Sequence, residues 1–125
     1  MSESEFKKVP TLDAFVEAVE KNGGVSLKEI GEGRTLVVET QNSTYTINII
    51  EPLTGKVTVH GGKSFPEQEE CTLSGSTFGG SMLKMNWIGL GMNMEFHRGE
   101  KGVTTTSPVH KISIVAPSVP QGTIH

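Results

Sequence analysis

The chain has 125 residues and a single cysteine, so we expect one domain and exclude a secreted scaffold held together by internal disulfides. Since no apolar run reaches the roughly 18 residues of a membrane helix, and the polar stretch from Met1 to Lys8 lacks the apolar core of a signal peptide, we expect a cytoplasmic protein without membrane contact. The formal net charge is −3 and the 11 lysines and arginines are scattered, which argues against a nucleic-acid partner because binding to phosphates requires clustered cations.

The first predicted element is an amphipathic helix over residues 11–22. Thr11 is a good N-cap, Gly23 and Gly24 provide a stop, and apolar side chains recur between them at helical spacing. These apolar residues are Leu12, Phe15, Val16 and Val19. We expect the helix to pack on a sheet through that face. Residues 1–9 are polar and are expected to form a flexible N-terminus.

After the helix the apolar side chains recur with a period of two, which is typical of strands. Turns containing glycine or asparagine separate four short segments of this kind, residues 25–30, 34–40, 44–50 and 56–60. In the third segment Tyr45, Ile47 and Ile49 share one face, which predicts a strand with one buried side.

The clearest predicted strand spans residues 87–97. Five apolar residues alternate there with glycine or polar residues, namely Ile88, Leu90, Met92, Met94 and Phe96. A turn with Gly102 in the left-handed conformation would join this strand to another over residues 103–115. In the register that matches the two apolar faces, His97 lies opposite Thr105.

Six or seven strands with short turns predict a mainly β fold, a small six- or seven-stranded antiparallel barrel with one N-terminal α-helix. Gly89 and Gly91 favour a barrel because glycines on one face let a strand coil sharply or let another backbone approach. Whether the barrel closes stays open at this point. The predicted domain covers residues 10–115, and residues 116–125, with two prolines and no periodicity, are expected to form a flexible tail.

The most unusual part of the sequence is the segment from Cys71 to Met94. It contains one charged residue, Lys84, together with five glycines and four of the five methionines. Glycines mixed with hydroxyl residues can direct backbone N–H groups at an anion, and Lys84 would add a positive charge. The spacing of a P-loop or of a dinucleotide-binding loop is missing. A simpler alternative therefore stays open, that this glycine-rich connection only covers one end of the barrel.

A second interpretation of the same segment is a protein-binding surface. Methionine side chains adapt to varied partners, and exposure of Met82, Met85 and Trp87 beside Phe78 would form an apolar patch. The candidate ligand- or partner-binding residues are Ser76, Thr77, Phe78, Gly79, Gly80, Ser81, Met82, Lys84, Met85 and Trp87. Our first hypothesis is a non-enzymatic binding module that meets a protein partner or self-associates as a homodimer. The alternative is a barrel that binds a small anionic ligand or a nucleotide through its phosphate.

The histidines and the cysteine give the weakest case for chemistry. Glu95 and His97 lie two apart on one face of a strand, which is the minimum for a two-ligand metal contact. With His110 they define a third hypothesis, a hydrolase or metal-dependent enzyme. No third ligand can be placed, so we expect solvated strand residues and no catalytic residue, metal or cofactor. Cys71 is expected to be a small buried hydrophobe, and the acidic residues of 67–70 a solvated loop.

Three stretches between Arg34 and Ile114 resemble known proteins, namely Ser76-Thr77-Phe78-Gly79-Gly80-Ser81, Trp87-Ile88-Gly89-Leu90-Gly91-Met92 and Thr106-Ser107-Pro108-Val109. They resemble a group of small, uncharacterised prokaryotic β-barrel proteins, and this resemblance implies no particular activity. Ser76-x-x-Gly79 is also similar to the end of the signature of the PilZ barrels, which bind cyclic di-GMP. Ser74 stands where that signature has an acidic or amide residue, and Arg34 is the only upstream arginine where two are expected.

Overall fold

The computed structural model describes residues 12–79 and 81–115. They form, in chain order, α2 (Leu12–Asn22), β1 (Gly24–Ser26), α3 (Leu27–Ile30), β2 (Thr35–Thr40), β3 (Thr44–Glu51), β4 (Lys56–Gly61), β5 (Phe65–Phe78), β6 (Ser81–Met85), β7 (Trp87–Gly89), β8 (Asn93–His97), a 3₁₀ turn (Gly99–Lys101) and β9 (Val103–Ile114). The predicted N-cap Thr11, the two predicted flexible ends and Gly80 lie outside the described residues.

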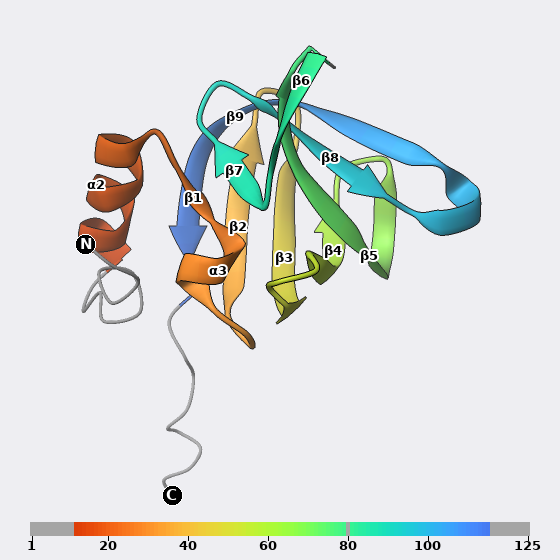
Figure 1. Ribbon diagram of the computed structural model, residues 1–125, viewed down its shortest axis with the longest axis horizontal. Helices are drawn as coiled ribbons and strands as arrows, with labels where there is room; N and C mark the ends of the chain where they lie inside the picture. Colours follow the sequence, from red (N-terminus) through yellow and green to blue (C-terminus); the bar gives the residue numbers. More distant parts are fainter. Residues whose placement is uncertain (1–11, 80, 116–125) are drawn as a thin grey trace, which may run out of the picture.

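Six of the strands close into a barrel (Figure 1). Their hydrogen-bonded order is β4-β3-β2-β9-β8-β5, and β4 also pairs with β5, which completes the ring. All of these pairings are antiparallel. The predicted mainly β fold with an N-terminal helix is therefore confirmed, and the strands form a closed ring.

Strand β5 is long enough to belong to two parts of the sheet. Its first half pairs with β4, up to Thr72 opposite Lys56. Its second half pairs with β8 on one edge, and its last residues pair with β6 on the other. Strand β6 is the terminal strand of the sheet order. The β5–β6 hairpin consequently extends beyond the ring, at the top of Figure 1.

The core is built from the alternating faces of the strands and from the apolar face of α2. Strand β3 buries its predicted face, Tyr45, Ile47 and Ile49. The ring centroid of Tyr45 lies 6.2 Å from that of Phe65 and 6.5 Å from that of Phe96. Helix α2 buries Phe15 and Val19 and packs against β9 and β1, as the helical spacing predicted.

Residues 25–30 do not form the single strand that their pattern predicted. Strand β1 ends at Ser26 and α3 follows at once. The Ser26 hydroxyl accepts a hydrogen bond from the Glu29 N–H, and the Glu29 carboxylate accepts one from the Ser26 N–H. This reciprocal capping box starts a helical turn, and the three-residue spacing of Leu27 and Ile30 buries both side chains beneath it.

The predicted continuous strand over residues 87–97 is wrong. Strand β7 ends at Gly89, and β8 begins only at Asn93. Between them Gly91 adopts a φ of +80°, and the Met92 N–H donates to the Gly89 carbonyl at 3.1 Å. The chain therefore turns here, and β7 pairs with β1 instead of continuing into the barrel.

The register of the β8–β9 hairpin also differs from the prediction. His97 lies opposite Val103 rather than Thr105. The Arg98 N–H donates to the Gly102 carbonyl at 2.8 Å and closes the loop around the 3₁₀ turn. Strand pairing therefore begins with His97 and Val103, closer to the loop than predicted. Gly102 has the positive φ that the prediction required, +86°, but its ψ of −149° lies outside the predicted left-handed helical conformation.

Candidate functional site

The segment singled out from the sequence forms the β5–β6 hairpin and the strand that follows it. Gly75 of β5 lies opposite Met85, and Ser76 lies opposite Lys84. A Cβ atom at Gly75 would overlap the Lys84 carbonyl oxygen. The absence of a side chain at Gly75 therefore allows β6 to lie directly against β5.

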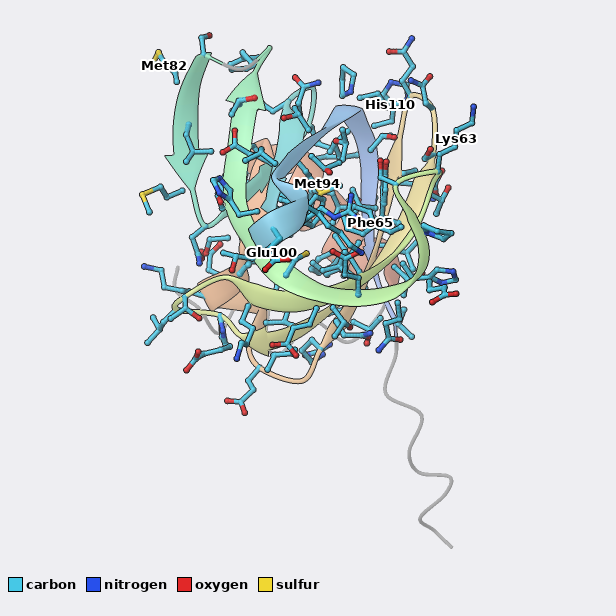
Figure 2. The ribbon with its side chains drawn as sticks, turned by 90° about the vertical axis from the view of Figure 1, so that its right-hand side faces the viewer. Lys63, Phe65, Met82, Met94, Glu100 and His110 are labelled. Atoms are coloured by element: carbon cyan, nitrogen blue, oxygen red, sulfur yellow. The ribbon has the colours of Figure 1, made fainter. Side chains whose placement is uncertain are left out.

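Four apolar side chains of this hairpin are exposed, and we call them the hairpin patch: Phe78, Met82, Leu83 and Met85. Their exposed fractions are 62%, 85%, 41% and 74% respectively. Met82 stands at the outer margin of the molecule (Figure 2). Phe78, Met82 and Met85 are thus exposed on one hairpin, which meets the condition for the predicted apolar surface at three of its four residues.

Met82 has a backbone conformation that glycine usually occupies. Its φ is +56°. The register shifts after Ser76, so that Thr77 lies opposite two residues, Met82 and Leu83, in a β-bulge. A left-handed conformation costs a residue with a side chain about 1 kcal/mol. The hairpin therefore holds its most exposed apolar side chain at a strained position.

Trp87 differs from the other residues of the predicted surface because it is only half-exposed. The Lys84 ammonium lies 3.8 Å from the centroid of its ring, a cation–π contact. Gly24 of β1 pairs with Gly89 of β7, and a Cβ atom on either glycine would overlap the indole. The close approach predicted at Gly89 is therefore present, and it makes room for the Trp87 ring.

Ser76 and Thr77 are buried rather than presented to a ligand. The Ser76 hydroxyl donates to the Trp87 carbonyl at 2.6 Å and accepts from the Gly89 N–H at 3.2 Å. This hydroxyl therefore fixes β7 to β5, a structural role that the hydroxyl-rich sequence did not reveal.

The tip of the hairpin also uses its polar groups internally. The Gly79 N–H donates to the side-chain oxygen of Asn93 at 3.1 Å, and the Ser81 hydroxyl donates to the Phe78 carbonyl at 2.9 Å. Lys84 lies over an aromatic ring. Because these groups already have partners, the geometry does not favour the anion site predicted for this loop.

The titratable residues named from the sequence are spread over the barrel. His97 Nε2 lies 2.9 Å from Glu95 Oε2, so the two residues share a face as predicted, whereas His110 is exposed on β9. Within residues 12–79 and 81–115, no three His, Cys, Asp or Glu residues are grouped so that they could hold a metal ion. Cys71 is buried as predicted, and burial raises the pKa of its thiol to about 11, so the thiol stays protonated.

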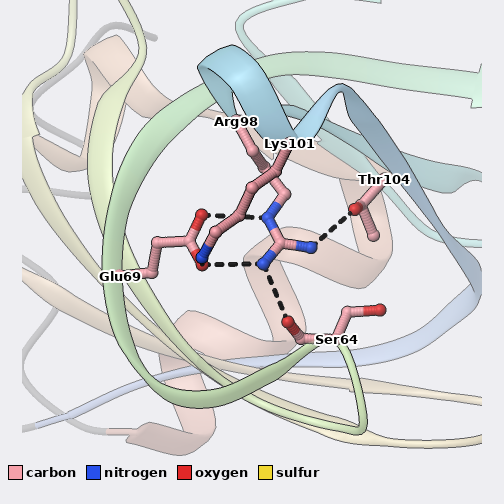
Figure 3. Close-up of polar contacts among 5 residues, drawn as sticks. All are labelled: Ser64, Glu69, Arg98, Lys101 and Thr104. Atoms are coloured by element: carbon pink, nitrogen blue, oxygen red, sulfur yellow. Dashed lines mark hydrogen bonds and ion pairs between the residues drawn. The ribbon is translucent and has the colours of Figure 1, made fainter.

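One carboxylate of the acidic run, which the sequence predicted as a solvated loop, is held on β5 by Arg98 (Figure 3). Arg98 Nε and Nη2 donate to the two oxygens of Glu69 at 2.9 and 2.7 Å. The guanidinium also donates to the Thr104 hydroxyl and the Ser64 carbonyl. The hydrogen bond from Arg98 is the main reason that the pKa of Glu69 falls to about 2. This group ties β5 to the β8–β9 hairpin.

Comparisons of the chain with models of protein families, with curated proteins and with solved structures found no match. In the part of the chain that the structure describes, no helix has the length and apolar character needed to cross a membrane.

Proposed function

We propose that this protein is a non-enzymatic binding module that acts through the hairpin patch, and that its partner is a second copy of the same chain. The observation that carries the proposal is the joint exposure of Phe78, Met82 and Met85 on a strand pair that extends beyond the barrel. Single apolar residues on a surface are ordinary, but a contiguous apolar patch is typical of an interface.

Among the strands of residues 12–79 and 81–115, β6 pairs with β5 alone, and its other edge favours a partner that supplies a strand. The Asn86 N–H donates to the Ser74 carbonyl of β5 at 3.0 Å. Because the direction of hydrogen bonding alternates along a strand, the N–H and C=O groups of Met85 point away from β5. Edge strands are commonly protected by an outward charge, but Lys84 lies over Trp87 instead. The edge of β6 is therefore available for pairing.

A second copy meets these requirements by symmetry. Two β6 edges related by a two-fold axis run antiparallel, so each copy offers the groups that the other needs. Residues 78–85 contain no acidic residue, so the contact buries no carboxylate. On typical side-chain areas the patch presents about 500 Å² per copy, and a symmetric contact would bury about 1,000 Å², near the lower limit for specific interfaces. We therefore expect a dimer with micromolar affinity.

Binding of a small anion at the same loop is the weaker candidate function. The Ser76 hydroxyl and the Gly79 N–H, two of the donors that such a site would use, have partners within the chain. The apolar side chains of the patch would also have no role in holding an anion.

Light scattering during size-exclusion chromatography, from micromolar to millimolar protein, tests the proposal. The measured mass should rise from one chain towards two. The double variant Met82→Lys/Met85→Lys should stay monomeric, because it places two charges in each half of the contact. Val103→Lys is the matched control, since Val103 is an exposed apolar strand residue, 54% exposed, in the β8–β9 hairpin. A wild type that is monomeric throughout, or a double variant that dimerises as well as the control, would refute the proposal.

A further inference from the structure

A polar cavity lies at the rim of the barrel, apart from the hairpin patch. Its volume is about 470 Å³, and its walls come from the β2–β3 turn, the start of β3, the β4–β5 turn and β9. In Figure 2, Lys63 of this cavity and Met82 of the hairpin patch are labelled on opposite sides of the molecule. Sites for small molecules have volumes of about 300–1,000 Å³, so this cavity has the size of one.

The hydroxyl of Tyr45 is the most informative group in the cavity. Tyr45 is only 6% exposed, and its ring packs against Phe65 and Phe96. No hydrogen bond joins its hydroxyl to another described residue, although a buried tyrosine hydroxyl usually has a partner. The residue lines the cavity. The unpartnered hydroxyl therefore offers a hydrogen bond to whatever enters.

Gly62 keeps the corner beside this hydroxyl open. A Cβ atom at Gly62 would lie 3.0 Å from the Tyr45 hydroxyl oxygen and 3.1 Å from the Ser43 Oγ. The two hydroxyl oxygens thus lie next to the same point in space. Ser43 Oγ likewise makes no hydrogen bond with another described residue, so two donors converge on this corner.

Lys63 is the only charged side chain in the lining of this cavity. It is exposed and forms no ion pair with any residue that the structure describes. A neighbouring cavity shares Lys63 but is lined also by Glu67 and by Glu69, whose carboxylate is paired with Arg98 and Lys101 of the same lining. The cavity lined by Tyr45 therefore combines one positive charge with neutral hydroxyl groups and has no carboxylate in its lining.

The hydroxyls that β9 contributes to the lining divide into those with partners and one without. The Thr104 hydroxyl accepts from Arg98. The Thr106 hydroxyl donates to the Ser107 carbonyl, and the Ser107 hydroxyl donates to the Thr40 hydroxyl. These two hydrogen bonds hold the wall of the cavity together. The Thr105 hydroxyl has no partner among the described residues and can both donate and accept. A neutral, hydroxylated part of a ligand would match it.

We infer that this cavity binds a small hydroxylated molecule that carries an oxyanion, of the kind found in sugar phosphates and sugar acids. The Lys63 ammonium and the hydroxyls of Tyr45 and Ser43 bind the oxyanion, because charge-assisted hydrogen bonds to an anion are the strongest that these groups can form. A lone phosphate would fill little of the volume, and Thr105 pairs with the hydroxyl groups of the rest of the ligand. This site is independent of the hairpin patch.

Titration of ¹⁵N-labelled protein with glucose 6-phosphate, gluconate, inorganic phosphate and glucose, followed by NMR, tests the inference. Saturable shifts are expected at residues 42–45, 62–64 and 104–107. The two charged sugars should bind at least tenfold more tightly than glucose, and their ratio distinguishes a phosphate from a carboxylate preference. Phosphate alone should bind more weakly than the sugar phosphate.

Two conservative variants locate the binding. Tyr45→Phe removes only the hydroxyl and keeps the ring packing, and Lys63→Gln removes only the charge. Each should weaken glucose 6-phosphate binding about fivefold to tenfold, whereas Lys84→Gln on the hairpin should leave it unchanged. Ser43→Ala is a further variant that does not touch the core. Absence of saturable shifts with all four probes at tens of millimolar, or equal affinity of the wild type and these three cavity variants, would overturn the inference.

Discussion

The strained conformation of Met82 gives the sharpest prediction, because stability and association should respond to Met82→Gly in opposite directions. Glycine accepts a φ of +56° without the steric cost that methionine has there, about 1 kcal/mol. Roughly half of this gain is offset by the larger conformational entropy of glycine in the unfolded chain. We therefore expect a net stabilisation of about 0.5 kcal/mol, or about 2 °C in melting temperature for a domain of this size.

The same substitution removes a side chain that is 85% exposed in the hairpin patch, so dimerisation should weaken. Thermal unfolding should be measured at a concentration at which the protein is monomeric, and light scattering at a concentration at which it dimerises. Met82→Ala is the control for the loss of the side chain, since it weakens association but does not relieve the backbone.

Asn86→Gly is the control for the backbone. Asn86 also has a positive φ, +60°, but its side chain donates to the Pro52 carbonyl and accepts from the Lys28 N–H. Removing these bonds should destabilise the protein by about 1–2 kcal/mol. A Met82→Gly variant that is less stable than the wild type, or one that dimerises equally well, would contradict the assignment of Met82 as a strained contact residue.

Two further predictions concern the parts of the barrel that hold the hairpin and the β8–β9 turn. The pKa of Glu69 lies near 2 rather than 4.5 because Arg98 binds the carboxylate, so the stability that Glu69 contributes is complete above pH 4.5 and is lost as the pH falls towards 2. Glu69→Gln should lower the free energy of unfolding at pH 7 by about 1–2 kcal/mol, allowing for solvent screening of a side chain that is 19% exposed. Denaturant titrations should show the difference from wild type shrinking below pH 4.5; a constant difference down to pH 2 would argue against the pairing. Gly75→Ala should separate β6 from β5, because its Cβ would overlap the Lys84 carbonyl oxygen, and hydrogen exchange at the backbone amides of Ser76 and Lys84 should accelerate while that of β3 stays slow. Unchanged exchange at Ser76 and Lys84 would show that β6 accommodates the added methyl group.

The fold class could be predicted because it depends on patterns that local sequence carries. The spacing of Phe15 and Val19 marks the buried side of a helix, and the alternation in β3 marks the buried side of a strand. Glycine positions were informative where backbones meet, as at Gly89, which pairs with Gly24 of β1. Each of these features is set by residues close in sequence or by the simple absence of a side chain.

The errors have equally local causes. The alternation over residues 87–97 continues through Gly91, so the apolar pattern conceals a turn that depends on the positive φ of this glycine. The capping box of Ser26 and Glu29 was present in the sequence, but the apolar alternation of residues 25–30 suggested a strand. A pattern of side chains is thus a weaker guide where glycines or caps change the backbone.

The remaining features could not have been predicted because they join residues far apart in the chain. Arg98 and Glu69 are brought together by the pairing of β5 with β8. The Tyr45 hydroxyl has no hydrogen-bond partner among the described residues, and it lines a cavity because the β4–β5 turn and β9 lie beside it. Sequence reasoning placed the candidate ligand site in the glycine-rich loop, whereas the polar cavity is built from Tyr45, which the strand pattern assigned to the core, and from polar residues of two turns and β9.

The most direct measurement of the central proposal is an isotope-filtered NMR experiment on a mixture of ¹³C-methyl-methionine-labelled and unlabelled protein, at a concentration at which dimers form. The proposal predicts intermolecular NOEs from the methyl groups of Met82 and Met85 to protons of β6 in the unlabelled chain. Intermolecular NOEs confined to another surface, or none at millimolar protein, would contradict it.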